Sequence, residues 1–199
     1  MINIDNYDIF GLRMPDAIAG WSFNDTNFYI SANEGDSRDS DESRGADLVD
    51  GDLSNGEIDT SEVSAELQAQ LADDALLGRL TFSNIDGDTD GDGLIEELYS
   101  FGGRSFTIYQ DGVGPIWDSG NLIEVVIANE VHEIFNANEG DPSNFDNRSD
   151  NKGPEPEGVA VGVVDGVTYG FIGLERVGGV IVMDLSDPTS PVYDHYIQI

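Results

Sequence analysis

Short apolar runs separated by turn signals fill the last quarter of the chain. After a polar stretch that ends in Gly-Pro-Glu-Pro-Glu-Gly, apolar residues dominate 158–164, 167–174 and 179–185, and a more polar run covers 191–199. Pairs such as Asp165-Gly166 and Gly178-Gly179 mark tight turns between the runs. The pattern predicts one antiparallel meander sheet. Because the runs are apolar on both faces, both faces should be covered, as in a β-propeller blade.

A similar unit occurs near the start of the chain. Residues 15–34 align without gaps with residues 156–175, at an offset of 141 positions, and three of the aligned pairs are identical: Pro15/Pro156, Ala19/Ala160 and Glu34/Glu175. Internal self-similarity of a strand-turn-strand unit is typical of repeat architectures. In both copies one acidic residue lies at the start of the first strand and another lies at the end of the second strand. Antiparallel pairing would bring these two acids to the same end of the blade.

Further strands are expected before the first copy, within it and between the two copies. The predicted strands are 7–10, 18–23, 28–32, 80–85, 97–101, 105–110, 115–118 and 122–127. Residues 33–60 are rich in Asp, Ser, Gly and Asn, a composition that buries little surface and predicts an exposed excursion. In 61–77, Val63, Leu67 and Leu71 recur every fourth residue, which predicts a short amphipathic helix with Thr60 or Ser61 as its N-cap.

These elements predict an all-β protein built from propeller-type antiparallel blades. We expect one partial propeller domain over residues 1–199, with an acidic insertion at about 37–79 that holds the one short helix. A blade takes roughly 40 to 45 residues, and the excursion uses a large share of the chain. We therefore expect an incomplete ring.

Charge narrows the range of partners. Forty acidic residues against eight basic ones give a formal net charge of −32. Such a field repels nucleic acid and anionic membranes and attracts divalent cations. No apolar run reaches the roughly 18 residues of a membrane span, and the N-terminus lacks a signal-peptide pattern. For a secreted protein, the signal and the anchor would lie outside this chain.

The sharpest chemical signal is the stretch DGDTDGDGLIEE at 86–97. Alternating Asp side chains around a tight Gly turn can place several hard oxygens around one Ca²⁺. A frame that starts at Asp86 ends on Glu97, whereas a frame that starts at Asp88 puts the poor ligand Tyr99 at its last position. The flanks are strand-like, which excludes an EF-hand. The predicted calcium ligands come from six acids: Asp86, Asp88, Asp90, Asp92, Glu96 and Glu97.

A second candidate site consists of charged residues near predicted strand ends. Its acids are Asp16, Glu34, Glu157 and Glu175, and its bases are Arg38, Arg104, Arg148 and Arg176. Acids and bases together at the mouth of a sheet domain could coordinate a metal or bind an anion. They could equally pair with one another and tie adjacent blades together, because buried polar groups need partners.

The common catalytic sequence motifs are incomplete or absent in this chain. His132-Glu133 begins a zinc-protease-like HExxH motif, but Asn136 stands where the second histidine belongs. The chain has no GxSxG elbow, no phosphate loop, no dinucleotide fingerprint and no cysteine. The residues therefore establish no catalytic nucleophile.

Several segments together resemble a known family. They are PDAIA, ANEGDSRD, DTDGDG, FGGRSF, FDNRSDNKGPEPEGV, GLERVGG and DLSDP, read in this order along the chain. The chain is similar to the choice-of-anchor I domain, which also occurs in mesenchyme-specific cell-surface glycoproteins and in atypical alkaline phosphatases. The resemblance implies a secreted or surface-anchored β-propeller, of which this chain holds only part.

Two functions remain open from the sequence. The favoured one is an extracellular or cell-surface module that binds Ca²⁺ and has a binding or structural role. The alternative is a metal-dependent phosphoester hydrolase in which Arg104, Arg148 or Arg176 holds the phosphate oxygens. The candidate partners are divalent cations, surface glycans, other proteins and phosphoesters.

Overall fold

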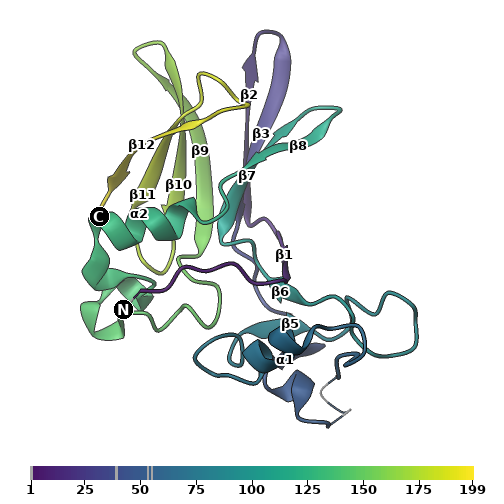
Figure 1. Ribbon diagram of the computed structural model, residues 1–199. Helices are drawn as coiled ribbons and strands as arrows, with labels where there is room; N and C mark the ends of the chain where they lie inside the picture. The colour runs from purple at the N-terminus through teal and green to yellow at the C-terminus, as the bar shows by residue number, and fades with distance from the viewer. Residues whose placement is uncertain (1, 39, 53, 55) are drawn as a thin grey trace. The chain divides into compact units, whose positions relative to one another are not determined.

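A computed structural model describes residues 2–38, 40–52, 54 and 56–199 (Figure 1). The chain forms two compact units. The first contains residues 1–4, 13–35 and 102–199, and the second contains residues 5–12 and 36–101. The described residues form three four-stranded sheets, with strand orders β2-β3-β7-β8, β12-β11-β10-β9 and β1-β6-β5-β4. The prediction of an all-β protein with propeller-type blades is thereby confirmed.

The first blade-like sheet consists of β2 (Ala17–Phe23), β3 (Thr26–Asn33), β7 (Ser105–Gln110) and β8 (Gly114–Asp118), all antiparallel. Between β3 and β7 the chain leaves for the second unit and returns at Gly102. A Cβ at Gly102 would lie 2.2 Å from the Glu34 carbonyl oxygen, and its φ is +81°. Only glycine allows the returning chain to pass so close to the end of β3.

The second blade-like sheet is the C-terminal meander predicted from the sequence. It consists of β9 (Pro156–Val164), β10 (Val167–Leu174), β11 (Val180–Asp184) and β12 (Val192–Ile197), paired in antiparallel order. The two repeat copies form the first two strands of the two sheets, β2–β3 and β9–β10. The sheets lie side by side, with β9 in contact with β2 and β3 (Figure 1).

The core of the first unit lies between these two sheets and a helix. Ile30 and Ile108 from the first sheet and Ile172 and Ile181 from the second are all fully buried there. Burying such side chains stabilises the fold by about 1.5 to 3 kcal/mol each.

Two predicted strands differ from the structure: the strand expected at 7–10 lies at 10–12, and the strand expected at 122–127 is a helix. Residues 122–127 belong to α2 (Leu122–Glu130). A short continuous apolar run does not distinguish a strand from a buried helix segment. Here Ile123, Val126 and Ile127 lie on one helical face and fill the core of the first unit, so tertiary packing decides in favour of the helix. The chain therefore has two α-helices among its described residues, not the single helix expected. Three short 3-10 helices follow α2: η3 (His132–Ile134), η4 (Asn138–Gly140) and η5 (Pro142–Asn144).

The second unit contains the predicted helix and a small sheet. α1 (Ala65–Leu71) is shorter than expected, and its N-cap is Ser64, whose hydroxyl accepts a hydrogen bond from the Leu67 amide at 3.2 Å. In the sheet, β1 (Phe10–Leu12) pairs parallel with β6 (Tyr99–Phe101), and β5 (Thr81–Ser83) pairs antiparallel with β6 and with β4 (Glu42–Arg44).

The polar excursion is more ordered than its composition predicts. Besides β4 it contains η1 (Asp47–Val49), and Leu48 and Ile58 are almost fully buried. They pack with α1 and β5 in a separate hydrophobic core that includes Leu71 and Phe82. Two well-placed apolar side chains are thus enough to anchor an otherwise polar segment.

As expected, the described strands do not pair into a closed ring. In the part of the chain that the structure describes, β12 pairs along one edge with β11, and β1 pairs with β6, so the terminal segments do not close a ring. No helix among the described residues has the length and apolar character needed to cross a membrane.

Candidate functional site

The acidic loop at 86–97 connects β5 to β6 in the second unit, so strands flank it on both sides. Gly87, Gly91 and Gly93 all adopt positive φ angles. The need for glycine is strongest at Gly87, because a Cβ there would lie 1.8 Å from the Glu97 carbonyl oxygen. The glycines therefore allow the chain to coil tightly enough to bring distant acids together.

Four of the six predicted calcium ligands converge in this loop. Asp88, Asp90, Asp92 and Glu96 each offer one carboxylate oxygen, and these oxygens all lie within 4.8 Å of one another. The three aspartates are exposed and Glu96 is half-buried. This set corresponds to the frame that starts at Asp88. Carboxylate oxygens at such spacing are the donor type that Ca²⁺ prefers.

Hydrogen bonds that two of the carboxylates accept fix the conformation of the loop. Asp88 accepts from the amides of Gly91 at 2.6 Å and Gly93 at 3.0 Å. Glu96 Oε2 accepts from the amide and the hydroxyl of Thr89. The other oxygen, Glu96 Oε1, is buried and has no hydrogen-bond partner among the described residues. One acceptor is thus left in the loop for a ligand to satisfy.

The other two predicted calcium ligands are engaged elsewhere. Asp86 forms an ion pair with Arg38 at 2.9 Å and accepts a hydrogen bond from Ser83 at 2.7 Å. The hydrogen bonds from Ser83 and Arg38 lower the pKa of Asp86 below its ordinary value. Glu97 accepts a hydrogen bond from the Tyr99 hydroxyl at 2.7 Å. Asp86 and Glu97 therefore hold the ends of the loop.

A buried ion-pair cluster lies in the first unit, and its centre is Glu155. This carboxylate is fully buried, and three cations surround it: Arg148 Nε at 3.0 Å, Arg176 Nε at 3.2 Å and Lys152 Nζ at 3.3 Å. Lys152 also pairs with Glu34 at 2.8 Å, and Arg176 pairs with Glu175 at 3.2 Å. The cluster thus joins the ends of β3 and β10 to the loop before β9.

Opposing effects set the pKa values in this cluster. Burial alone would raise the pKa of Glu155, but the hydrogen bond from Arg148 and the charges of Lys152, Arg148 and Arg176 together lower it. For Glu175 the outcome is opposite: burial raises its pKa, Arg176 counteracts this, and the nearby charges of Glu155 and Glu157 raise it further. Glu155 is therefore the carboxylate that the fold holds firmly in its charged form.

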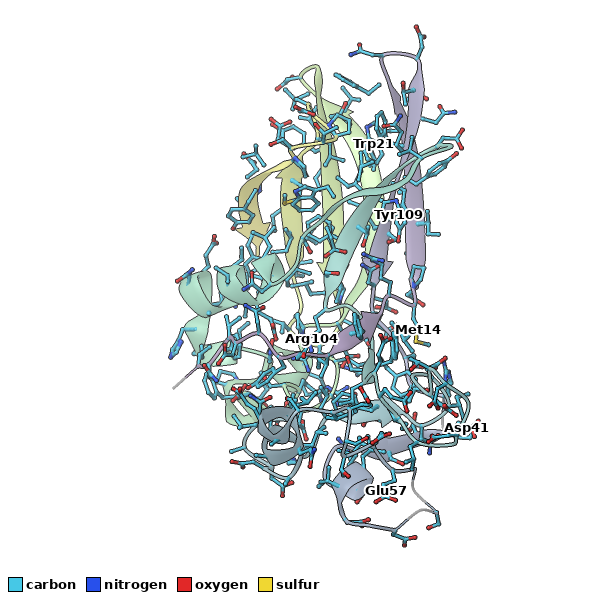
Figure 2. All side chains as sticks on the ribbon, turned by 45° about the vertical axis from the view of Figure 1, so that its right-hand side comes forward. Met14, Trp21, Asp41, Glu57, Arg104 and Tyr109 are labelled. Carbon is cyan, nitrogen blue, oxygen red and sulfur yellow. The ribbon has the colours of Figure 1, made fainter. Side chains whose placement is uncertain are left out.

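Arg104, labelled in Figure 2, belongs to a neighbouring polar network in the same unit. Its guanidinium pairs with Glu124 at 3.2 Å and donates to the carbonyl oxygens of Ser149 and Asn151. Glu124 also accepts from the amide of the buried Asn136 at 2.7 Å. These bonds fasten the loop before β9 to α2.

Of the eight charged residues predicted near strand ends, four lie around Glu155: Glu34, Arg148, Glu175 and Arg176. Asp16 is exposed at the start of β2, where its amide donates to the Ala32 carbonyl. Glu157 is exposed and lines, with Glu175, an open hollow of about 450 Å³. Arg38 pairs with Asp86 within the second unit.

Sequence reasoning missed the two central members of the cluster, Glu155 and Lys152. The available signals were the stretch Gly-Pro-Glu-Pro-Glu-Gly, which contains Glu155, and the fact that Lys152 is the only lysine in an acidic chain. A lone lysine among so many acids is a reasonable candidate for a buried ion pair.

Comparison with known proteins identifies the family. The model of the choice-of-anchor I domain matches residues 1–188. The chain belongs to the choice-of-anchor I domain family. It is 38% identical to Gigasin-3a of Magallana gigas over 114 residues, which are 55% of this chain and 40% of that protein. It is 33% identical to the mesenchyme-specific cell surface glycoprotein of Strongylocentrotus purpuratus over 149 residues, which are 66% of this chain and 19% of that protein.

This choice-of-anchor I chain spans less than half the length of either curated relative. No solved structure matches the chain at a significant level.

Proposed function

We propose that this choice-of-anchor I chain is an extracellular or surface-displayed module that binds Ca²⁺ through the loop at 88–96. The observation that carries the proposal is the convergence of Asp88, Asp90, Asp92 and Glu96. Ca²⁺ takes about six to eight oxygen ligands, and carboxylates, backbone carbonyls and water all serve. Four carboxylates would supply the protein's main share, and backbone carbonyls and water the rest.

Electrostatics favour a cation at this position. Four carboxylates at close range repel one another, and the net charge of −32 provides no general compensation. A bound divalent cation relieves this repulsion. It also offers a partner to Glu96 Oε1, and buried polar atoms normally have one.

The position of the loop supports a stabilising role for the ion. The loop connects β5 to β6, and Ile95 and Leu98 at its end belong to the core of the second unit. An ion that binds only the folded loop stabilises the fold by mass action, by about 2.7 kcal/mol at a concentration 100 times the Kd. The second unit would therefore gain most from calcium.

The extracellular location rests on the family and its members. One relative bears the name of a cell surface glycoprotein, and the similarity covers 19% of that protein. The acidic composition agrees with a calcium-rich environment outside the cell, where sites of modest affinity are filled.

Isothermal titration calorimetry with Ca²⁺ tests the proposal directly. We expect the wild type to bind and Asp88→Asn/Asp90→Asn to lose binding. The matched control is Glu62→Gln/Glu66→Gln, which removes the same charge from exposed positions of the same unit. Equal heats of binding for the wild type and the Asp88→Asn/Asp90→Asn variant would show that Ca²⁺ does not bind in this loop.

Phosphoester hydrolysis, the alternative from the sequence, has less support. It needs cations that are available to phosphate oxygens, but Arg148 and Arg176 pair with Glu155, and Arg104 with Glu124. This pairing favours a structural role for the three arginines. We expect no aryl-phosphate turnover with or without Ca²⁺. Metal-dependent turnover that is lost in Arg176→Ala would instead support the function of a phosphoester hydrolase.

A further inference from the structure

The sequence contains two Asn-x-Ser/Thr tripeptides, Asn24-Asp25-Thr26 and Asn147-Arg148-Ser149. This tripeptide is the acceptor sequence for N-linked glycans in secreted proteins. A glycan is bulky and hydrated, so a folded protein accommodates it only at a position that faces solvent. The two tripeptides lie in very different surroundings in the first unit.

Asn24 occupies the tip of the β2–β3 hairpin. Phe23 pairs with Thr26, which leaves Asn24 and Asp25 as a two-residue loop with φ angles of +49° and +61°. Two successive positive φ angles correspond to a type I′ turn, for which Asn is a preferred residue. In Figure 1 this loop projects beyond the end of the first sheet, away from α2 of the same unit.

The side chain of Asn24 is available for modification. It is exposed, and in the described part of the chain it makes no hydrogen bond. The nearest side-chain bond joins Ser22 Oγ to Asn27 Oδ1 at 2.7 Å, one step down the hairpin. The backbone defines the turn and the strand pairing defines the hairpin, so a glycan on the Asn24 amide leaves both unchanged.

Asn147 lies in the opposite situation although its side chain is exposed. Its Oδ1 accepts a hydrogen bond from the Asn138 amide at 3.0 Å. The hydroxyl of Ser149, which the acceptor tripeptide requires, donates to Asp146 and accepts from Asn136 at 2.8 Å. Between them, Arg148 pairs with the buried Glu155. The whole tripeptide is thus part of the internal network that holds the loop before β9.

From this contrast we infer that Asn24 is the N-glycan acceptor of this chain and that Asn147 is not. The hairpin tip leaves a glycan free in solvent, whereas a glycan on Asn147 would crowd a loop whose neighbouring side chains, Arg148 and Ser149, are bound in the internal network. The inference rests on the extracellular location proposed above but not on calcium binding, since Asn24 lies in the first unit and the acidic loop in the second.

Secretion of the full chain from eukaryotic cells behind a signal peptide provides the test. Intact mass before and after peptide-N-glycosidase treatment, with peptide mapping, locates each glycan. We expect one glycan, on Asn24, in the wild type and in Asn147→Gln. We expect none in Asn24→Asp, which keeps a residue suited to positive φ, or in Thr26→Val. Thr26→Ser retains the acceptor tripeptide and should keep the glycan.

The melting temperature of Asn24→Asp provides a control on folding, and we expect it to stay close to that of enzymatically deglycosylated wild type. A wild type secreted without a glycan would overturn the inference. So would a glycan on Asn147, or a glycan that persists in Asn24→Asp.

Discussion

The side chains of Arg148 and Glu155 meet inside the first unit, where Arg148 Nε lies 3.0 Å from Glu155 Oε1 and Glu155 is fully buried. Glu155 has a positive φ of +52°, an unusual conformation for this residue type. The surrounding ion pairs compensate the cost of burying the charge. They also join segments that are far apart in the sequence, because Lys152 pairs with Glu34.

Removal of the Glu155 charge should destabilise the protein strongly. Glu155→Gln leaves three cations without their central partner, and loss of one member of a buried pair costs about 3 to 5 kcal/mol. Urea unfolding measures the change, with Glu133→Gln as the control, because Glu133 is exposed in the same unit. Equal stability of the two variants would contradict a structural role for the cluster.

Glu155 should also make the stability of the protein depend on pH. Its cationic neighbours outweigh burial and lower the pKa of Glu155 in the folded protein below the ordinary 4.5. Its contribution to stability is therefore fully present above the unfolded pKa and is lost as the pH falls through the folded pKa. We expect the unfolding free energy of the wild type to fall more steeply below pH 4.5 than that of Glu155→Gln. Parallel curves from urea unfolding at each pH would contradict this expectation.

Two glycines of the acidic loop should respond differently to alanine. Both have positive φ, but a Cβ at Gly87 meets the Glu97 carbonyl oxygen at 1.8 Å, whereas a Cβ at Gly91 meets nothing within 4 Å. Gly91→Ala should cost about 1 kcal/mol for its backbone conformation alone. Gly87→Ala should cost clearly more, because the loop must open. Thermal unfolding of both variants compares them, and equal melting temperatures would show that the close approach at Gly87 is unimportant.

Calcium should protect the second unit in preference to the first. Addition of Ca²⁺ should slow amide hydrogen exchange in β5, β6 and the core around Phe82, and a chelator should reverse the effect. The β10 amides in the first unit serve as an internal control. Uniform protection of both units, or none in the second, would contradict a site in the acidic loop.

Much of the architecture was predictable from the sequence because its signals are local. Turn pairs such as Asp165-Gly166 separate apolar runs of strand length, and these runs correspond to β9 to β12 with ends that agree within two residues. The acidic loop was equally evident, because its four converging carboxylates lie within nine residues of chain, Asp88 to Glu96. In both cases the interacting groups are close in the sequence, so spacing alone limits the possible geometry.

Other features depended on contacts between distant residues. The run at 122–127 is apolar enough for a strand, and it became part of α2 because Ile123 and Ile127 fill the core between the two sheets. The role of Glu155 was also hidden, since its cluster includes Glu34, which is far away in the sequence. The sequence by itself determined most of the strands, the turns and the acidic loop. Only the tertiary structure decided which charges are buried together, because desolvation and pairing depend on the packing of distant segments.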